Sequence, residues 1–275
     1  MGGDSVFVLG IDVGSLTAKA VVLDGQGGMR GYSVVQTGIV SQQAAQASVE
    51  QALARAAVGR SDICYAVATG YGRARVDWAQ GNITEISCHA RGAHHLLPQA
   101  RMVIDIGGQD SKVIALDQDG LVVSFVMNDK CAAGTGRFLE VMARALEVNL
   151  GEMGQLSLQA QNPCHVSSMC TVFAESEVIS LVAEGHSKAD IIAGLHEAIA
   201  RRLVAMVKRV GNPRNVVMTG GVAKNVGMVR ALEGLLGTTL TLPPEPQIVG
   251  ALGAALFAME QVQEESFQAG LKGKQ

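Results

Sequence analysis

The sequence predicts an α/β protein built as two similar lobes, and three observations carry that prediction. Strand-like and helix-like patterns mix in both halves of the chain. A motif in the first half returns in the second half at a constant spacing. Glycine accounts for 33 of the 275 residues, and the glycines gather after apolar runs, where a backbone can approach a ligand. We therefore expect a ligand between the duplicated lobes.

Composition and charge narrow the class of protein. Hydrophobic residues make up 48% of the chain and aromatic residues only 4%, which excludes intrinsic disorder and predicts a mainly aliphatic core. Lys and Arg number 22 against 25 Asp and Glu, with no basic stripe, so we expect no nucleic-acid partner. The longest apolar stretch, residues 248–259, is shorter than the ~20 residues of a membrane span. Five scattered cysteines form no disulfide framework, and we expect a cytoplasmic protein without a membrane partner.

The internal repeat joins residues 10–24 to residues 103–117 at an offset of 93. Each copy predicts a strand, a glycine turn and a second strand, which together form a β-hairpin. The predicted strands cover residues 6–13 and 18–23 in the first copy and residues 102–106 and 112–116 in the second. The matched pairs are Asp12 and Asp105, Gly14 and Gly107, Lys19 and Lys112, Asp24 and Asp117, and Gly27 and Gly120. Five matches at one offset argue for duplication.

Helical patterns follow the hairpins. One covers residues 41–57, and a longer one opens at Ser187 with a capping-box-like start and runs to about Arg209. A strand from residue 216 leads into a Gly-Gly turn and a helix over 226–236, and we expect adenosine to lie against Gly220, Gly221 and Asn225. Residues 247–256 predict a small-residue helix that serves close packing. We place one lobe at residues 1–92 plus about 248–275, and the other at residues 93–247.

The two hairpin turns suit a nucleotide. An Asp before a glycine turn aims a carboxylate toward outward-facing N–H groups, an arrangement that suits a phosphate with hydrated Mg²⁺. We assign Asp12 and Asp105 to hydrated Mg²⁺, and two copies in register argue against the alternative that each turn is merely a tight hairpin. We assign phosphate binding to the backbones of Gly14, Ser15, Gly107 and Gly108, with Thr17 beside them. Lys19 and Lys112 either add charge or are solvated strand residues. Gln109 or Asp110 would orient the attacking water.

Two cysteines precede predicted helices. Cys131 comes before an amphipathic pattern over residues 138–146, and Cys170 has a similar place before residues 171–181. A thiolate near a helix N-terminus is stabilised by the macrodipole and by free N–H groups, so both cysteines are suited to act as anionic ligands. The alternative is that each is a small buried hydrophobic residue.

The turns, the Gly-Gly element and the small-residue helix, in this order, resemble the acetate kinase, sugar kinase, Hsp70 and actin superfamily. That resemblance implies a duplicated, two-lobed, ribonuclease H-like ATPase fold. It leaves kinase and ATPase undecided, so a small-molecule kinase stays an alternative, as does a non-catalytic nucleotide sensor.

The run Asn-Asp-Lys-Cys-Ala-Ala-Gly-Thr-Gly at residues 128–136 is more specific. With it, nearly the whole chain resembles the ATP-dependent activator components of 2-hydroxyacyl-CoA dehydratases, whose wider family includes ATPase subunits of benzoyl-CoA reductase. The other stretches that carry this resemblance are residues 9–19, 68–73, 104–112, 166–181, 218–223 and 250–256.

The resemblance implies that Cys131 and Cys170 hold one 4Fe-4S cluster shared across a homodimer. It also implies ATP and ADP with Mg²⁺ as ligands, ferredoxin or flavodoxin as the donor of one electron, and a separate dehydratase or reductase component as its acceptor. The count of ligands agrees, because such a cluster takes four thiolates and a two-fold axis doubles two to four.

The remaining cysteines and the histidines lie outside this motif. We expect Cys164 to be a loop thiol, and the alternative is a separate site that it forms with Cys170. Cys64 and Cys88 sit among apolar neighbours and are expected to be structural. The six histidines show no ligand spacing, and we expect surface or capping positions for them.

Overall fold

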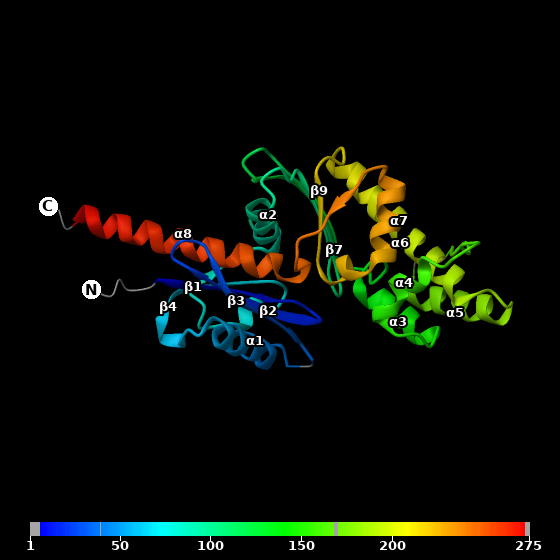
Figure 1. Cartoon of the computed structure of the whole chain (residues 1–275), viewed down its shortest axis with the longest axis horizontal. Coiled ribbons are helices and arrows are strands. Elements are labelled where there is room, and N and C mark those ends of the chain that lie inside the picture. Colours follow the sequence, from blue (N-terminus) through cyan, green and yellow to red (C-terminus); the bar gives the residue numbers. More distant parts are fainter. Residues whose placement is uncertain (1–5, 39, 168–169, 273–275) are drawn as a thin grey trace. The chain divides into compact units, whose positions relative to one another are not determined.

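The computed structural model describes residues 6–38, 40–167 and 170–272, without the side chains of residues 269–272. Two compact units make up the chain (Figure 1). Unit 1 comprises Met1–Pro98 and Gln247–Gln275, and unit 2 comprises Gln99–Pro246. The lobe boundary expected at residues 92 and 93 falls inside helix α2 (Glu85–Leu96), which the structure keeps whole in unit 1.

Unit 1 contains a five-stranded sheet in the order β3-β2-β1-β4-β5. In chain order the strands are β1 (Phe7–Val13), β2 (Thr17–Asp24), β3 (Met29–Gln36), β4 (Ile63–Thr69) and β5 (Gly81–Asn82). β1 and β2 form the predicted hairpin, β3 continues it as an antiparallel strand, and β4 pairs with β1 in parallel. The β-branched and aliphatic residues of β1 suit a strand that is buried on both faces.

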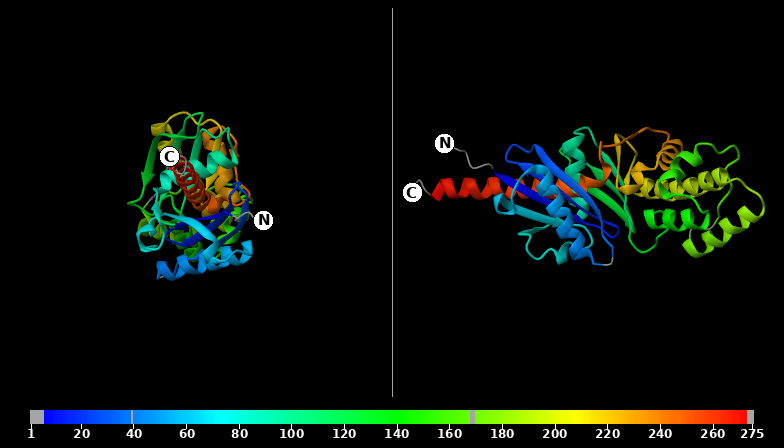
Figure 2. Two further views of the ribbon diagram at one scale, coloured as in Figure 1. Left: turned by 90° about the vertical axis from the view of Figure 1, so that its left-hand side faces the viewer. Right: turned by 60° about the horizontal axis from the view of Figure 1, so that its bottom comes forward.

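Helices cover both faces of this sheet. They are α1 (Ser41–Ala56), α2 and α8 (Val249–Lys272), with short 3-10 turns at Arg60–Asp62, Arg73–Arg75 and Pro246–Ile248. Because strand side chains alternate between faces, Leu9 packs with the α1 cluster while Val8 packs with the α8 cluster. A Cβ at Gly253 of α8 would lie 1.8 Å from the carbonyl oxygen of Cys88 on α2, so the predicted close packing of residues 247–256 is confirmed. The C-terminal part of α8 extends beyond the sheet of unit 1 (Figure 2).

Unit 2 repeats the topology of unit 1. Its sheet has the order β10-β9-β6-β7-β8, which corresponds strand for strand to unit 1 when both are followed from the hairpin outward. The strands are β6 (Met102–Ile106), β7 (Ser111–Leu116), β8 (Val122–Asn128), β9 (Val216–Thr219) and β10 (Leu240–Thr241). The duplication that the offset of 93 predicts is thus confirmed, and it extends to five strands in each unit.

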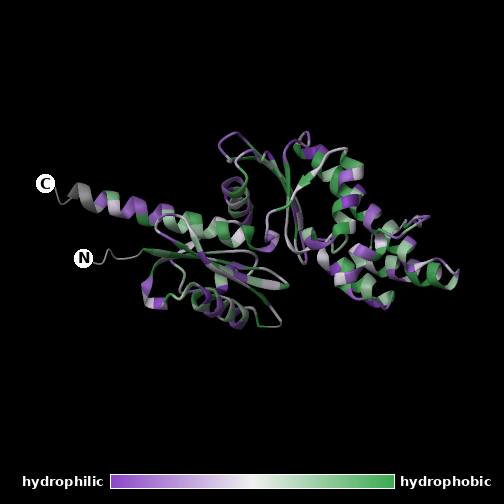
Figure 3. Cartoon of the chain, viewed as in Figure 1, coloured by the Kyte–Doolittle hydropathy of each residue, from purple (hydrophilic) through white to green (hydrophobic). Residues whose placement is uncertain are grey.

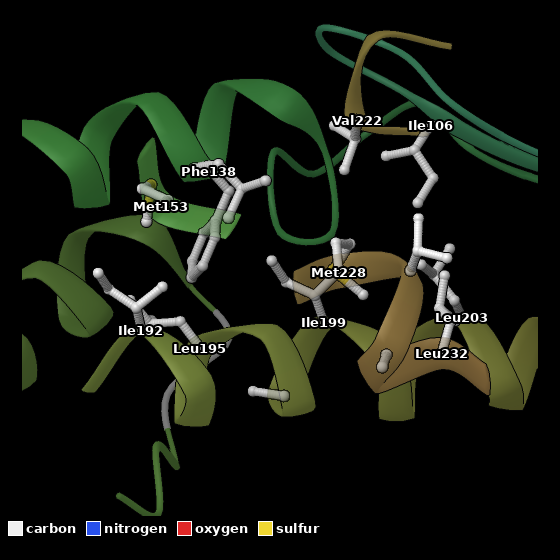
Figure 4. Close-up of a cluster of buried hydrophobic side chains, with 14 of the residues drawn as sticks. Ile106, Phe138, Met153, Ile192, Leu195, Ile199, Leu203, Val222, Met228 and Leu232 are labelled. Atoms are coloured by element: carbon white, nitrogen blue, oxygen red, sulfur yellow. The ribbon is translucent and has the colours of Figure 1, made fainter. Parts of the chain in front are cut away.

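Unit 2 differs in the helices between its third and fourth strands. Its helices are α3 (Gly136–Ala145), α4 (Met153–Ser157), α5 (Thr171–Ala183), α6 (Lys188–Val210) and α7 (Val226–Leu236), with 3-10 turns at Leu150–Glu152 and Gly221–Lys224. α6 begins as predicted, because the Ser187 side chain accepts a hydrogen bond from Asp190 N at 3.1 Å. Side chains from α3, α4, α6 and α7, including Phe138 and Ile199, pack into one apolar core with Ile106 of β6 (Figure 4).

Candidate functional site

In unit 1, an acidic residue, a lysine and a threonine from three adjacent strands meet near the end of β1. Asp12 on β1 lies opposite Lys19 on the antiparallel strand β2 and opposite Thr69 on the parallel strand β4. Lys19 Nζ donates to Asp12 Oδ2 at 3.0 Å, and Asp12 is only 5% exposed. Gly14 N donates to Thr17 O at 3.0 Å and closes the turn that links the two strands.

Unit 2 has the same arrangement around Asp105. This residue lies opposite Lys112 on β7 and Thr219 on β9. Lys112 Nζ contacts Asp105 Oδ2 at 3.3 Å, and Thr219 Oγ1 donates to Asp105 Oδ1 at 2.8 Å. Gly107 N donates to Asp110 O at 3.0 Å, as Gly14 N does to Thr17 O in unit 1. Lys112 also contacts Asp110 Oδ1 at 2.8 Å, so it lies between two carboxylates.

A glycine with a positive φ follows the threonine in each unit. The φ angles are +87° at Gly70 and +86° at Gly220. A Cβ at Gly70 would lie 2.5 Å from Asp12 Oδ1, and one at Gly220 would lie 2.9 Å from Asp105 Oδ1. Each Thr-Gly pair therefore brings backbone up to the carboxylate, which a larger residue would prevent. Sequence reasoning missed Thr69 and Gly70, although a Thr-Gly pair ends both apolar strands.

The lysines and most of the turn residues are at least partly buried. Lys112 has a side chain only 2% exposed and that of Lys19 is 13% exposed, so the alternative that they are solvated strand residues is wrong. Ser15 and Thr17 are half-buried in the first turn, as are Gly107, Gly108 and Asp110 in the second, whereas Gln109 is exposed.

The Gly220–Gly221 pair links β9 to the 3-10 turn that precedes α7. Gly220 N donates to Pro246 O at 3.0 Å, and the exposed Gly221 begins a 3-10 turn. Asn225 is the N-cap of α7, because its side chain accepts from Met228 N at 3.0 Å. Its Nδ2 also lies 3.2 Å from His196 Nε2, so the helix and a buried histidine already engage the Asn225 side chain.

Two histidines are buried, so the expectation of surface positions is wrong for them. Burial lowers the pKa of His196 on α6 from 6.5 to about 4, and this ring is neutral near pH 7. His89 on α2 is 5% exposed. A Cβ at Gly250 would lie 3.0 Å from His89 Nε2 and 3.2 Å from Asp12 Oδ2, so this glycine leaves room between the histidine and the carboxylate.

The two motif cysteines differ in their relation to the following helices. Cys170 is exposed and is the N-cap of α5, as its predicted place before a helix requires. Cys131 is half-buried in the loop after β8, and Thr135 is the N-cap of α3. Cys131 thus precedes that cap by four residues and does not sit at the helix start. α3 and α5 pack against each other.

The other three cysteines are also free thiols. Cys164 is buried, and its pKa is raised by burial and by Asp190, whose carbonyl accepts from Cys164 N. Burial raises the pKa of Cys88 to about 12. Cys64 is exposed at the start of β4. Both buried thiols therefore stay protonated at neutral pH.

Within the described ranges, no three His, Cys, Asp or Glu side chains gather into a group that could hold a metal ion. In the same part of the chain, no helix combines the length and the apolar character that crossing a membrane requires.

Comparison with known proteins decides the family. The model of the BadF/BadG/BcrA/BcrD ATPase family matches residues 9–258. The chain belongs to this family. It is 51% identical over 260 residues to the activator of lactoyl-CoA dehydratase from Anaerotignum propionicum, and the match covers 94% of this chain and 100% of that protein.

Solved structures agree with the family assignment. The activator of the 2-hydroxyisocaproyl-CoA dehydratase from Clostridium difficile with bound ADPNP has a TM-score of 0.91 and 45% identity, covering 95% of this chain and 97% of that one. Component A of the Acidaminococcus fermentans (R)-2-hydroxyglutaryl-CoA dehydratase has a TM-score of 0.90 and 45% identity, covering 93% and 98%.

A more distant structure bears on the fold alone. A ROK family glucokinase from Streptomyces griseus has a TM-score of 0.58 at 13% identity and covers 92% of this chain and 99% of that one. Together with the repeated sheet topology, this likeness confirms the duplicated actin- and sugar-kinase-like ATPase fold that the sequence predicts.

Proposed function

We propose that this ATPase carries single electrons to a 2-hydroxyacyl-CoA dehydratase or a related acyl-CoA reductase component. The observation that carries the proposal is the pair Cys131 and Cys170, two free thiols that precede the packed helices α3 and α5 of unit 2, in a chain of this ATPase family. A small-molecule kinase would have no need of such a pair.

The donor set fits an iron–sulfur cluster. Cys170 is exposed and Cys131 is half-buried, so neither is sealed in the core as Cys88 and Cys164 are. Thiolates are the usual ligands of a 4Fe-4S cluster, which takes four of them, and this chain supplies two. When bound, such a cluster would accept and release one electron at a time.

A homodimer would complete the ligand set. Four large apolar side chains of α5 are between 42% and 67% exposed, and Figure 3 shows hydrophobic residues recurring along this helix. They are Val172, Phe173, Ile179 and Val182. A second copy packed on this face would cover them and bring two further cysteines to the same place through a two-fold axis.

The two Asp-Lys-Thr arrangements would bind the nucleotide. Asp12 and Asp105 would hold hydrated Mg²⁺, with ATP or ADP as the ligand. The backbones of Gly14–Ser15 and Gly107–Gly108 would meet phosphates. Thr17, Lys19 and Lys112 line these turns, and adenosine would lie against Gly220 and Gly221, where Asn225 shapes the wall by capping α7.

The turn of unit 2, which contains Gln109 and Asp110, would position the attacking water. The Asp110 carboxylate is already engaged by Lys112, whose Nζ lies 2.8 Å from Asp110 Oδ1. Gln109 is exposed one residue earlier and would orient the water, as a glutamine does in other nucleotide hydrolases. Asp110 would then hold Lys112 in place.

ATP would drive an electron transfer that is uphill. For a one-electron step, each ~59 mV against the gradient costs a factor of ten in the equilibrium constant. Ferredoxin or flavodoxin would donate the electron in the cytoplasm. The dehydratase component would accept it; the relatives from A. propionicum and C. difficile are named as activators of dehydratases, which supports a dehydratase as the partner.

The test compares three cysteine variants of the full chain purified without oxygen. Cys131→Ser and Cys170→Ser should each lose the cluster, because the axis removes two of four ligands, while ATP affinity is retained. Cys164→Ser is the matched control in unit 2 and should keep its iron and sulfide. If Cys164→Ser loses the cluster while Cys131→Ser keeps it, the proposed ligand set is wrong.

A further inference from the structure

The loop that carries Cys131 is held by one side chain at the end of β8. Asn128 Nδ2 donates to Cys131 O at 2.9 Å and to Ala133 O at 3.0 Å. The bonds hold the carbonyl of Cys131 itself and that of Ala133 two residues later, so they fix the backbone from the cysteine onward. Asn128 is itself half-buried, where such bonds are worth more than at an exposed site.

Arg202 of α6 orients this asparagine. Its Nη2 donates to Asn128 Oδ1 at 3.1 Å, across 74 positions of the chain. The bond leaves the amide nitrogen of Asn128 facing the loop, since oxygen and nitrogen occupy opposite sides of the amide. The Arg202 stem also passes Gly134, where a Cβ would lie 3.4 Å from Arg202 Cδ. The cysteine loop is thereby tied to the long helix α6.

The other end of the loop is tied to the second glycine turn. Gly136 N donates to Gly107 O and Arg137 N donates to Gly108 O, both at 2.8 Å. These donors open α3, and Thr135 links them back to the loop because its Oγ1 donates to Ala132 O at 2.6 Å. A shift of the Gly107–Gly108 turn therefore moves the start of α3 and the backbone next to Cys131.

Cys170 is held differently. It is the N-cap of α5, and Ala174 N donates to Cys170 O at 2.8 Å as the first turn of that helix. Its helix packs against α3 and α6, whereas the carbonyls of the Gly107–Gly108 turn accept their hydrogen bonds from the start of α3. The two cysteines of unit 2 thus differ in how directly they are connected to the turn.

We propose that Asn128 and Arg202 are positioning residues for Cys131, and that they make its loop move as one piece with the Gly107–Gly108 turn. The nucleotide state would then be transmitted mainly to Cys131, with Cys170 as the more static ligand. The inference rests on the proposed function for the cluster, but the connection itself is a property of the chain.

The experiment measures how fast iodoacetamide alkylates each cysteine in the full-length, reduced chain, with ADP or with ADPNP. Peptide mass spectrometry separates Cys131 from Cys170, which serves as the internal reference. In the wild type, the exchange of ADP for ADPNP should change the Cys131 rate at least about fivefold, in the usual range of coupling between sites, and the Cys170 rate much less. Asn128→Ala and Arg202→Ala should remove most of that change while nucleotide affinity stays within about twofold.

Two further variants keep the result interpretable. Arg201→Ala alters the neighbouring, exposed arginine of α6, which pairs with Glu197, and should respond as the wild type does. Asn128→Asp keeps the acceptor for Arg202 and removes the donors to the loop, so it should lose the response even if Asn128→Ala unfolds. The proposal is overturned if both asparagine variants keep the wild-type response, or if Cys131 in the wild type does not respond to nucleotide.

A second readout uses the iron-loaded dimer. The rate at which bathophenanthroline removes iron should depend on ADP or ADPNP in the wild type and lose this dependence in Asn128→Asp. If the wild type holds no iron but its Cys131 alkylation responds as described, the proposed electron carrier fails and the positioning role stands. Iron in the wild type with an unaltered response in Asn128→Asp would overturn the positioning role alone.

Discussion

Unit 1 and unit 2 have the same backbone around their first hairpins, yet different charges line the two turns. Among the described residues, Lys19 forms an ion pair with Asp12 alone, whereas Lys112 lies between Asp105 and Asp110. The offset of 93 places Thr17 where unit 2 has Asp110. One turn therefore offers a hydroxyl group at the position where the other offers a second carboxylate.

The difference indicates that the two copies of a duplicated turn can take different roles. Both turns keep the closing bond from glycine N–H to a carbonyl, so both can present backbone to a phosphate. Only unit 2 surrounds its lysine with two carboxylates, and there Thr219 orients Asp105 as well. We expect unit 1 mainly to bind the nucleotide and unit 2 to carry the chemistry and pass the signal to Cys131.

The largest effect should come from removing the buried lysine of unit 2. Lys112→Met leaves two carboxylates close together without their shared cation, which should cost about 4 kcal/mol of unfolding free energy. Lys19→Met is the matched comparison and should cost less, about 3 kcal/mol, because the Lys19 side chain is more exposed than that of Lys112 and its loss leaves one buried carboxylate, not two. Urea unfolding of both variants measures the difference, and equal costs would contradict the comparison.

The buried histidine should make the unfolding free energy depend on pH. The folded pKa of His196 is about 4 against 6.5, so between these values the unfolded chain binds a proton that the folded chain does not. The contribution of His196 to the unfolding free energy is therefore fully present above pH 6.5. It is lost as pH falls toward 4, and the total loss is about 3 kcal/mol. His196→Gln should flatten this dependence, whereas His186→Gln, at an exposed site in the same unit, should leave it unchanged.

In catalysis too, loss of the acidic residue of unit 2, Asp105, should have a larger effect than loss of its counterpart in unit 1, Asp12. Asp105→Ala should lower Mg²⁺-dependent ATP turnover about 100-fold and Asp12→Ala about tenfold, as is usual when a group that orients a hydrated metal is lost. Cluster content should stay near normal in both variants, because the cysteines are elsewhere. Turnover with iron content checks this, and undiminished turnover in both would mean that the turns are only hairpins.

The smallest effect should distinguish the two threonines. Thr219→Val removes the donor to Asp105 and should cost about 1.5 kcal/mol of unfolding free energy. Among the described residues, the buried Thr69 hydroxyl has no hydrogen-bond partner, so Thr69→Val should be nearly neutral. A loss of stability in Thr69→Val as large as that in Thr219→Val would show that the units are more alike at this position than their contacts indicate.

The local part of this architecture could be predicted from the sequence. A hairpin joins residues close in the chain, so the repeat predicted both hairpins, and the structure shows that their pairing puts Asp12 opposite Lys19 and Asp105 opposite Lys112. The Gly-Gly strand and its helix were also recognisable, since turn and capping residues mark their ends.

The parallel pairing was not recognisable as a repeat. Thr69 follows Asp12 by 57 positions and Thr219 follows Asp105 by 114, because the helices α3 to α6 lengthen the second crossover. No constant offset can reveal such a pair. The bond between Asn128 and Arg202 depends on the same tertiary packing, and so does the burial of His196.

Native mass spectrometry of the chain purified without oxygen tests the central claim most directly. The account predicts a dimer that carries the mass of one cluster with about four irons and four sulfides, shared by two chains. Exposure to air should convert this species to a lighter one without iron, since one of the two cysteine ligands, Cys170, lies at an exposed helix start. A monomer that keeps a whole cluster, or a dimer with two, would contradict the account.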